Sequence, residues 1–443
     1  MRRSVFFSVL VTVVLLVSLV GPSDAGEVNT RYLHASDVKT LLPWISQNAI
    51  GRPSTALLLH RMLSATVIAL KQRHVRPAPL PHLPGGSPHD ILVFIHWLNR
   101  REASPVGRSL VLRQALRQML TSLHEDGTRF YMPDTYMEPP EVEGYDKGGV
   151  GILVSDTPDS HGHFIIFETL DGFPCSDAGI RPGDRLVSVN GRSVVGMSYR
   201  QLADRVRGNL GTRVTLGILR RGTPAPLHFT LERVWLNPNP KNISWKVLDK
   251  HVGYIRIKFM GDRLNLEMMQ AFAYFKREGV RQVILDLRNN EGLLTSSEGL
   301  GAVFLGDNRE ITRLVSNTGV AVERTHGLQA TNLPTIVLVN RYTCPSGILL
   351  AGALRDYHAA RVLGEATIWR DQPRVARTLP DGSTVRVTTG YYLLPGGEVL
   401  RTRSRSLRPD ILVPQNPLDP LGTNSDRQLQ KAVLLLSASP SNP

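Results

Sequence analysis

The sequence predicts a mixed α/β protein with three parts: an N-terminal helical segment, a small domain made mostly of strands, and a larger layered α/β core. Helical spacing of apolar residues begins at Asp37 and recurs in stretches up to Leu123. From Gly148 the pattern changes to short strands separated by glycine turns. After a proline-rich junction at 235–242, continuous apolar strands alternate with helices. Such alternation is typical of a sheet whose two faces are both covered.

The first 25 residues differ from the rest of the chain. Arg2 and Arg3 precede an uncharged, mostly apolar run from Ser4 to Val20, and Ser23-Asp24-Ala25 places small residues before a cleavage point. This pattern predicts a signal peptide at 1–25, cut after Ala25, and an exported protein that is periplasmic or secreted. The run approaches the roughly 20 residues of a spanning helix, so a retained membrane tether is the alternative.

The composition is that of a globular protein long enough for more than one buried core. The chain has 443 residues, of which 42% are apolar and 20% charged, with a net charge of +14. Removal of the signal would leave 50 basic and 37 acidic residues, a net charge of +13. For an exported protein, this charge favours an anionic envelope surface or acidic partners over nucleic acid. Cys175 and Cys344 exclude a disulfide framework but allow one bridge.

The predicted N-terminal region, 26–145, contains helical stretches around Asp37–Leu70, Ile91–Leu98 and Ser109–Leu123, with a Pro/Gly-rich loop at 76–90. It also contains three evenly spaced histidines, namely His82, His89 and His96. Two of them lie in the loop, and no cysteine lies near them in the sequence. We therefore expect solvated or capping histidines and neither a metal site nor another cofactor.

The second region, 146–236, resembles a PDZ domain. The resemblance is carried by GGVGILV at 148–154, SDAGIRPGDRLVSVNG at 176–191 and the helical stretch SYRQLADRVRG from Ser198. It is similar to the PDZ domain of carboxyl-terminal processing (tail-specific) serine proteases, which implies binding of peptide or protein C-termini.

The expected peptide site of this domain begins at its first glycines. Backbone N–H groups along Gly149, Val150, Gly151 and Ile152 could receive a carboxylate. The strand that follows could pair with an extended peptide. The resemblance assigns the pocket for the last side chain of the ligand to Ile152, Leu202 and Val206, although these residues could equally be core alone.

The resemblance to tail-specific proteases continues through the third region. VILDLRNNEGLL (283–294), LPDGSTVRVTTGYYLLPGGEVL (379–400) and LRPDILV (407–413) are similar to the family's D-L-R-x-N-x-G-G turn, L-P-D-G-S strand pair and P-D segment. It implies a crotonase-like α/β core at 241–414, followed by a C-terminal tail or helix at 415–443.

The segments that should carry catalysis depart from the family. When VNRYTCPSGILLAGALRD (339–356) is anchored on Asn340 and ILLAGALRD, the nucleophile position falls on Pro345 and the glutamate after it on Ile348, while Asp356 matches. In GEATIWRDQPR (364–374) the catalytic lysine corresponds to Arg370 and its supporting glutamine to Arg374. Trp369 and Asp371 replace the glycines that flank the lysine, and NNEGL has one glycine where the family has two.

These replacements predict a pseudoprotease. Proline has no hydroxyl or thiol to form an acyl-enzyme, and arginine stays protonated and cannot act as a base. The predicted role is that of an adaptor or regulator that binds the C-termini of peptides or proteins. An active protease relative is a candidate partner, and the sequence also allows an oligomer.

Two alternative nucleophiles neighbour Pro345. A one-residue slip would place Ser346 at the attack position, but the slip requires an insertion or deletion and still lacks a lysine base. Cys344 is better explained as a small buried residue.

The substituted cleft could also bind an acidic ligand through a basic rim. Its members would be Arg370, Arg374, Arg401, Arg403, Arg405 and Arg408. A solvated edge that resists aggregation is the favoured interpretation of this run.

Overall fold

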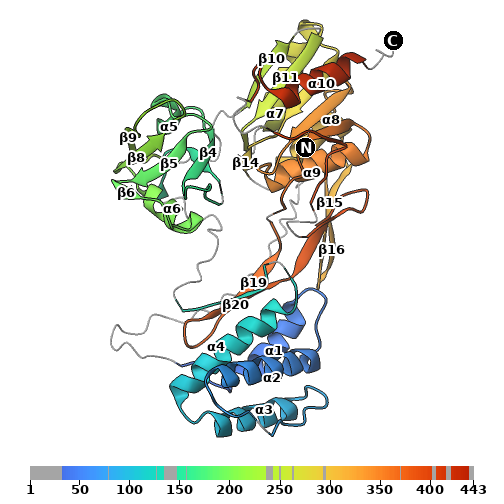
Figure 1. Ribbon diagram of the computed structural model, residues 1–443. Coiled ribbons are helices and arrows are strands. Elements are labelled where there is room, and N and C mark those ends of the chain that lie inside the picture. Colours follow the sequence, from blue (N-terminus) through green and yellow to red (C-terminus); the bar gives the residue numbers. More distant parts are fainter. Residues whose placement is uncertain are drawn as a thin grey trace, which may run out of the picture.

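The structure is a computed structural model with a mixed α/β fold, as the sequence predicted (Figure 1). It describes residues 32–77, 79–125, 127–133, 147–155, 157–235, 243–248, 251–261, 264–292, 296–369, 371–401, 406–415 and 421–438. The predicted signal segment 1–25 lies outside the described residues. Within the described ranges, no helix combines the length and the apolar character that crossing a bilayer requires.

Four helices form the N-terminal unit: α1 (Asp37–Asn48), α2 (Thr55–Gln72), α3 (Pro88–Arg101) and α4 (Pro105–Thr121). Serines cap three of the starts, because the Ser54, Ser87 and Ser104 side chains each accept a backbone N–H of the first turn. Apolar faces of all four helices meet in one core, which Val385 and Val387 from a distant hairpin complete.

The PDZ unit is a sheet with the strand order β3-β4-β5-β8-β9, and its two short helices pack against it. β3 lies at one edge and pairs with β4 alone among the described strands. The elements of the unit are β2 (Lys147–Gly148), β3 (Ile152–Val154), β4 (Phe164–Thr169), α5 (Pro174–Asp177), β5 (Arg185–Val189), β6 (Arg192–Ser193), α6 (Tyr199–Val206), β7 (Gly208–Asn209), β8 (Arg213–Leu219) and β9 (Leu227–Glu232).

The core is a six-stranded sheet with the order β10-β11-β13-β17-β18-β23, parallel except for the β10–β11 pair. Residues of α7, α8 and α9 share one hydrophobic cluster with the sheet, and α10 shares another that contains the alternate strand residues. The sheet is therefore covered on both faces. Its elements are β10 (Ile243–Leu248), β11 (Val252–Ile257), α7 (Leu264–Arg277), β13 (Gln282–Asp286), α8 (Ser296–Leu305), β17 (Thr335–Val339), α9 (Pro345–Asp356), β18 (Ala360–Gly364), β23 (Ile411–Leu412) and α10 (Arg427–Ala438).

Two hairpins connect the core to the helical unit (Figure 1). At the tip of the first, the Asn317 side chain donates to the Asn48 carbonyl at the end of α1, at 2.6 Å. In the second, the Asp381 carboxylate accepts from Arg113 of α4 at 2.8 Å. The remaining strands are β1 (Arg129–Tyr131), β12 (Phe259–Met260), β14 (Glu291–Gly292), β15 (Glu310–Ser316), β16 (Gly319–Arg324), β19 (Arg374–Thr378), β20 (Thr384–Thr388), β21 (Gly390–Leu393) and β22 (Val399–Leu400).

Candidate functional site

The segment that should present a nucleophile is the turn between β17 and α9. Asn340 organises it, because its side-chain oxygen accepts the Tyr342 N–H at 3.0 Å and its own N–H donates to the Thr343 hydroxyl at 3.0 Å. The turn after β13 is hydrogen-bonded to this turn, since the Asn290 side-chain oxygen accepts the Cys344 N–H at 2.8 Å. The two turns form one hydrogen-bonded unit at the carboxyl ends of adjacent parallel strands.

Pro345 is the first residue of α9, where a proline requires no hydrogen-bond partner for its nitrogen. Ser346 follows in the same turn and is fully buried, with 0% of its surface exposed. Its hydroxyl lies 3.1 Å from the Cys344 sulfur, and this is its partner within the described chain. Burial raises the pKa of the Cys344 thiol to about 12, so this neighbour stays protonated and cannot act as a base.

The other positions of the expected catalytic group are structural or lie beyond the described chain. Ile348 is buried in the main hydrophobic cluster, and Trp369 is buried against Tyr392 with ring centroids 5.3 Å apart. Arg370 lies outside the described residues, while Arg374 begins β19. Asp356, at the other end of α9, accepts from the Arg355 guanidinium at 2.9 Å.

Three carboxylates influence one another near the expected base segment. Burial raises the pKa of Asp371 even though Arg374 opposes it, and burial also raises the pKa of Glu298 on α8. Burial, together with the charges of Glu298 and Asp371, raises the pKa of Glu323 on β16 to about 7. Sequence reasoning missed this acidic group, because its members come from segments far apart in the chain.

The arginines of the possible basic rim are partly described by the structure. Arg401 forms an ion pair with Glu125 of the helical unit, so its charge is already matched. Arg374 is partly neutralised by Asp371, and Arg408 is exposed. Arg370, Arg403 and Arg405 lie outside the described residues. For the described members, the solvated or internally paired edge is the better description.

Beneath the two turns lies a buried ionic network. Arg288 donates to both oxygens of Asp286, at 2.8 and 2.6 Å, and to both oxygens of Asp426, at 2.9 and 2.6 Å. The Tyr254 hydroxyl adds a bond of 2.7 Å to Asp286. Burial alone would raise the pKa of Asp286, but the guanidinium outweighs it and the pKa is lowered. The network links the turn after β13 to the C-terminal helix.

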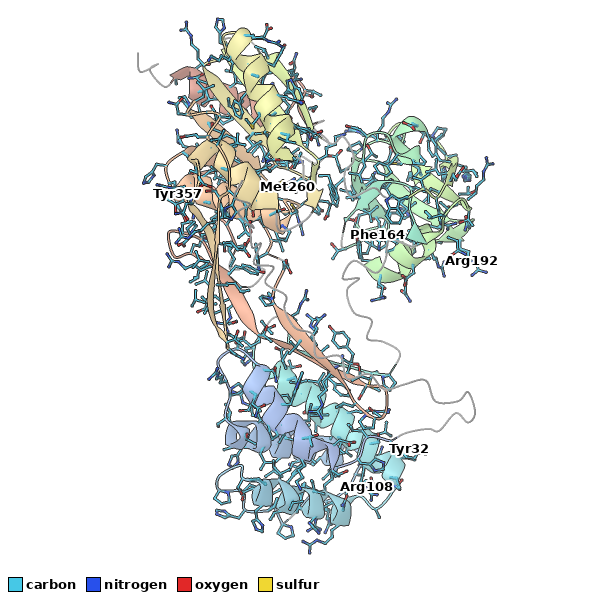
Figure 2. The ribbon with its side chains drawn as sticks, turned by 180° about the vertical axis from the view of Figure 1, so that it is seen from behind. Tyr32, Arg108, Phe164, Arg192, Met260 and Tyr357 are labelled. Carbon is cyan, nitrogen blue, oxygen red and sulfur yellow. The ribbon has the colours of Figure 1, made fainter. Side chains whose placement is uncertain are left out.

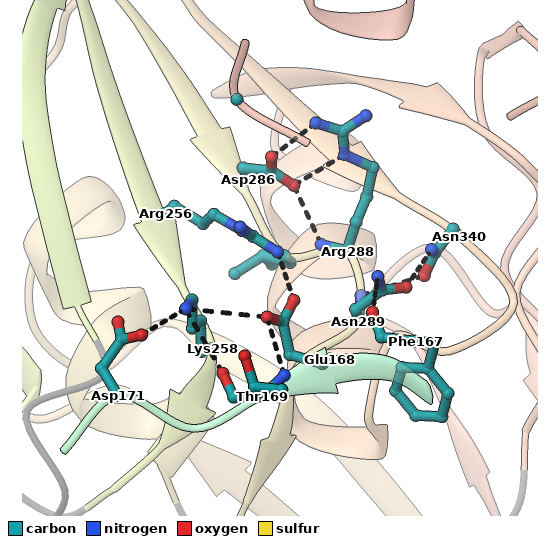
Figure 3. A network of polar contacts seen from close by, with 12 residues as sticks. Phe167, Glu168, Thr169, Asp171, Arg256, Lys258, Asp286, Arg288, Asn289 and Asn340 are labelled. Carbon is teal, nitrogen blue, oxygen red and sulfur yellow. Dashed lines mark hydrogen bonds and ion pairs between the residues drawn. The ribbon is translucent and has the colours of Figure 1, made fainter. Parts of the chain in front are cut away.

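The PDZ unit contacts this site directly (Figure 3). Glu168 of β4, with 1% of its side chain exposed, forms ion pairs with Arg256 and Lys258 of the core. The Asn289 amide donates to the Phe167 carbonyl at 2.9 Å. The Phe167 ring stacks on Tyr342, with centroids 4.2 Å apart and planes 11° from parallel. The PDZ unit thus touches both turns at the expected nucleophile position.

Sequence reasoning missed this interface. The available signal was the single carboxylate of Glu168 within the apolar strand FIIFET, because a lone charge in a buried strand requires a partner. Lys258, whose ammonium lies 2.6 Å from the Asp171 carboxylate, is part of the same contact.

At the expected peptide site, Gly151 has a φ of +83°, and a Cβ there would lie 2.4 Å from Cβ of Phe173, so the position requires glycine. The N–H groups of Val150 and Gly151 have no acceptor within the described chain, whereas that of Gly149 donates to Val234. Ile152 is half-buried at the start of the edge strand β3. Leu202 and Val206 belong to the core of the unit, with Ile152 packed against that core.

Within the described residues, the two cysteines form no disulfide and the three spaced histidines belong to no metal-binding group. Cys175 and Cys344 are free, buried thiols, so the described structure contains no bridge between them. His82, His89 and His96 are exposed, and His96 bonds the Leu92 carbonyl of its own helix. In the part of the chain that the structure describes, no group of three or more His, Cys, Asp or Glu residues is placed to hold a metal ion.

Comparisons with known proteins agree with this architecture. Peptidase family S41 matches residues 251–413, and a PDZ domain matches residues 172–220. The chain is 30% identical over 329 residues to a carboxyl-terminal-processing protease of Synechocystis sp., covering 73% of this chain and 76% of that protein. It is 28% identical over 325 residues to a chloroplastic C-terminal processing peptidase of Tetradesmus obliquus, covering 68% of this chain and 69% of the relative.

A solved structure of a photosystem II D1 C-terminal processing protease has the same fold. Its TM-score is 0.50 at 23% sequence identity, and the match covers 88% of this chain and 99% of the solved one. Domain content, sequence and fold therefore agree, and the chain belongs to the carboxyl-terminal-processing protease family, peptidase family S41, and carries a PDZ domain.

Proposed function

We propose that this chain is an exported, catalytically inactive member of the family, which binds the C-termini of other proteins through its PDZ domain and acts as an adaptor or regulator. The observation that supports the proposal most directly is that α9 begins with Pro345, the residue to which the resemblance assigns the nucleophile position. A proline side chain offers no atom that can form an acyl-enzyme.

The neighbouring groups do not compensate for the missing nucleophile. Ser346 is fully buried beside a protonated thiol, so substrate cannot reach it and no base activates it. Lys258 is held by Glu168 and Asp171, and the lysines after it in the sequence, Lys276 and Lys431, are exposed on α7 and α10. Removal of a nucleophile or its base lowers turnover by about 10³- to 10⁶-fold, so the loss of both leaves no useful rate.

Binding of a peptide C-terminus requires neither a nucleophile nor a base, and the PDZ unit has the groups that such binding needs. A carboxylate can accept from the free N–H groups of Val150 and Gly151, and an extended peptide can pair with the open edge of β3. A ligand on β3 would lie one strand away from Glu168, since Leu153 pairs with Glu168 across the two strands. A peptide could therefore influence the contact with the core, which supports a regulatory role.

The first test separates binding from cleavage. The chain from Gly26 onward is incubated with an unfolded protein that has an apolar C-terminus, and with peptides that end in either a free carboxylate or an amide. We expect binding without cleavage, and affinity for the carboxylate at least about tenfold higher, because a charge-assisted hydrogen bond contributes about 1.5–3 kcal/mol. Cleavage that Ser346→Ala abolishes would refute the proposal and establish an active serine peptidase.

A pair of variants locates the binding site. Ile152→Asp places a negative charge where the carboxylate and its apolar side chain should bind, so affinity should fall by at least about tenfold. The matched control is His228→Asp, which is exposed on β9 at the opposite edge of the same sheet and should bind normally. Equal affinities of the two variants would place the ligand elsewhere.

A further inference from the structure

The helical unit presents a surface with almost no negative charge. Residues 37–121 contain eleven lysines and arginines but only three acidic residues. All three are engaged: Asp37 accepts the His34 N–H at 2.8 Å, Asp90 completes the capping box of α3, and Glu102 lies 3.6 Å from Arg73. Outside this range, Asp381 pairs with Arg113 of α4. Lys71 and Arg117, by contrast, are exposed, and no ion pair is found for either within the described chain.

Basic and apolar side chains share one face of α2 and α4. These two helices pack closely and run in opposite directions, because Arg61 bonds Ser122 while Gln114 bonds Gln72. Helical spacing puts Ile68 four residues before Gln72 and three before Lys71, so Ile68 neighbours both side chains. On α4, Leu110 and Arg117 are in line with Gln114. We call this surface the α2–α4 face and define it by Ile68, Lys71, Val106, Leu110 and Arg117.

The apolar members of the α2–α4 face are unusually open. The exposed fractions are 47% for Ile68, 48% for Val106 and 42% for Leu110, whereas most other apolar residues of α2 and α4 belong to the core of the helical unit. Exposed apolar side chains grouped with cations, without carboxylates between them, are the pattern of a surface that binds membranes. Acyl chains receive the apolar groups, and lipid phosphates pair with the cations.

The sequence places this face near a bilayer. Sixteen residues separate the apolar run ending at Val20 from the start of α1 at Asp37, a reach of at most about 60 Å. We propose that the α2–α4 face docks on an anionic phospholipid membrane, during export or while the N-terminal run is retained. Docking of this unit would leave the PDZ unit, which lies apart from it in Figure 2, accessible to proteins at the same membrane.

The test uses the chain from Gly26 onward, which contains every described residue but not the apolar run. It is sedimented with vesicles of phosphatidylcholine, alone or mixed with phosphatidylglycerol. We expect binding to the anionic vesicles and release when salt is raised from about 0.05 M to about 0.5 M, because screening weakens the attraction. Equal binding to both vesicle types, or no binding to either, would overturn the proposal.

Charge variants test the location. The double variant Lys71→Glu and Arg117→Glu should weaken binding by at least about 25-fold, since each basic side chain near an anionic surface contributes about fivefold. The control is Arg192→Glu with Arg221→Glu, which makes the same change of charge at exposed positions on the PDZ unit. Equal losses in the two double variants would mean that total charge alone attracts the protein, and the face would not be the site.

An apolar variant distinguishes a membrane from another polyanion. Ile68→Ser with Leu110→Ser keeps every charge and should weaken vesicle binding by at least about tenfold, while unfolding stays close to wild type because both side chains are exposed. If this variant binds vesicles normally while the charge variant does not, the face binds acidic polymers and the membrane proposal fails.

Discussion

The contact between the PDZ unit and the core gives the sharpest prediction, through the variant Glu168→Ala. Glu168 has 1% of its side chain exposed, and its partners Arg256 and Lys258 have 13% and 14% exposed. Removal of one partner from a buried ion pair costs about 3–5 kcal/mol. Lys258 keeps Asp171 at 2.6 Å and both cations retain some access to water, so the lower end applies, about 3 kcal/mol.

The other contacts between the PDZ unit and the core are too weak to compensate for the free energy lost in Glu168→Ala. The stacking of Phe167 on Tyr342 contributes about 0.5–1.5 kcal/mol, and the bond from Asn289 to the Phe167 carbonyl about 1 kcal/mol. The pair of Lys258 with Asp171, whose side chain is 55% exposed, adds about 0–1 kcal/mol. A loss of about 3 kcal/mol lowers the docking equilibrium more than a hundredfold. We therefore expect Glu168→Ala to separate the PDZ unit from the core.

Small-angle scattering should report this separation as a larger radius of gyration. Limited proteolysis should show faster cleavage at the proline-rich junction, 235–242. The control is Asp204→Ala in the same unit, whose carboxylate is 55% exposed and lies 3.7 Å from Arg200, a surface pair of little value. If both variants scatter and digest alike, the ion pairs of Glu168 do not hold the two units together.

Three further variants test the electrostatics of the site and the proposed lack of catalysis. The pKa of Glu323 is raised to about 7, so the folded state binds more protons than the unfolded chain between about pH 4.5 and 7 and stability falls as pH rises through this window. Glu323→Gln should therefore raise the free energy of unfolding by about 1–2 kcal/mol at pH 8, after allowance for partial exposure, and should change it little below pH 4.5. An equal increase at both pH values, measured by urea unfolding, would contradict this. Asp426→Ala should lower the free energy of unfolding by about 3 kcal/mol in the same assay, because the buried Arg288 loses one of its carboxylate partners. The control Gln430→Ala should change stability little, because Gln430 is exposed. Pro345→Ser should show no peptidase activity, since a hydroxyl there would still lack a base; hydrolysis by this variant would show that a base exists.

Local features of the fold could be predicted from the sequence, because local chemistry determines them. A helical stretch was expected from Ser198, and in the structure Ser198 caps α6 through a capping box with Gln201. Apolar strands alternating with helices were expected to form an α/β core, and β17 and α9 pack in that core. The prediction of the family and fold is confirmed by the comparisons.

Interactions over long sequence separations could not be predicted in this way. Glu168 and Arg256 are 88 positions apart, and Arg401 meets Glu125 across 276 positions. Hydrophobic periodicity indicates which face of a strand is buried, but it does not specify which distant charge lies opposite. The basic rim illustrates the limit, because the partner of Arg401, Glu125, comes from the helical unit and is distant in the sequence.

The substitution at position 345 separates folding from catalysis in physical terms. The first N–H groups of a helix have no acceptor within it, so a proline at the start of α9 leaves no bond unmade and restricts the unfolded chain. The turn keeps its bonds to Asn340 and Asn290, and the PDZ unit still stacks on Tyr342. Proline at this position is therefore compatible with the shape that the PDZ unit contacts, and its side chain has no atom that could form an acyl-enzyme. Both properties are what the proposed function, binding without hydrolysis, requires.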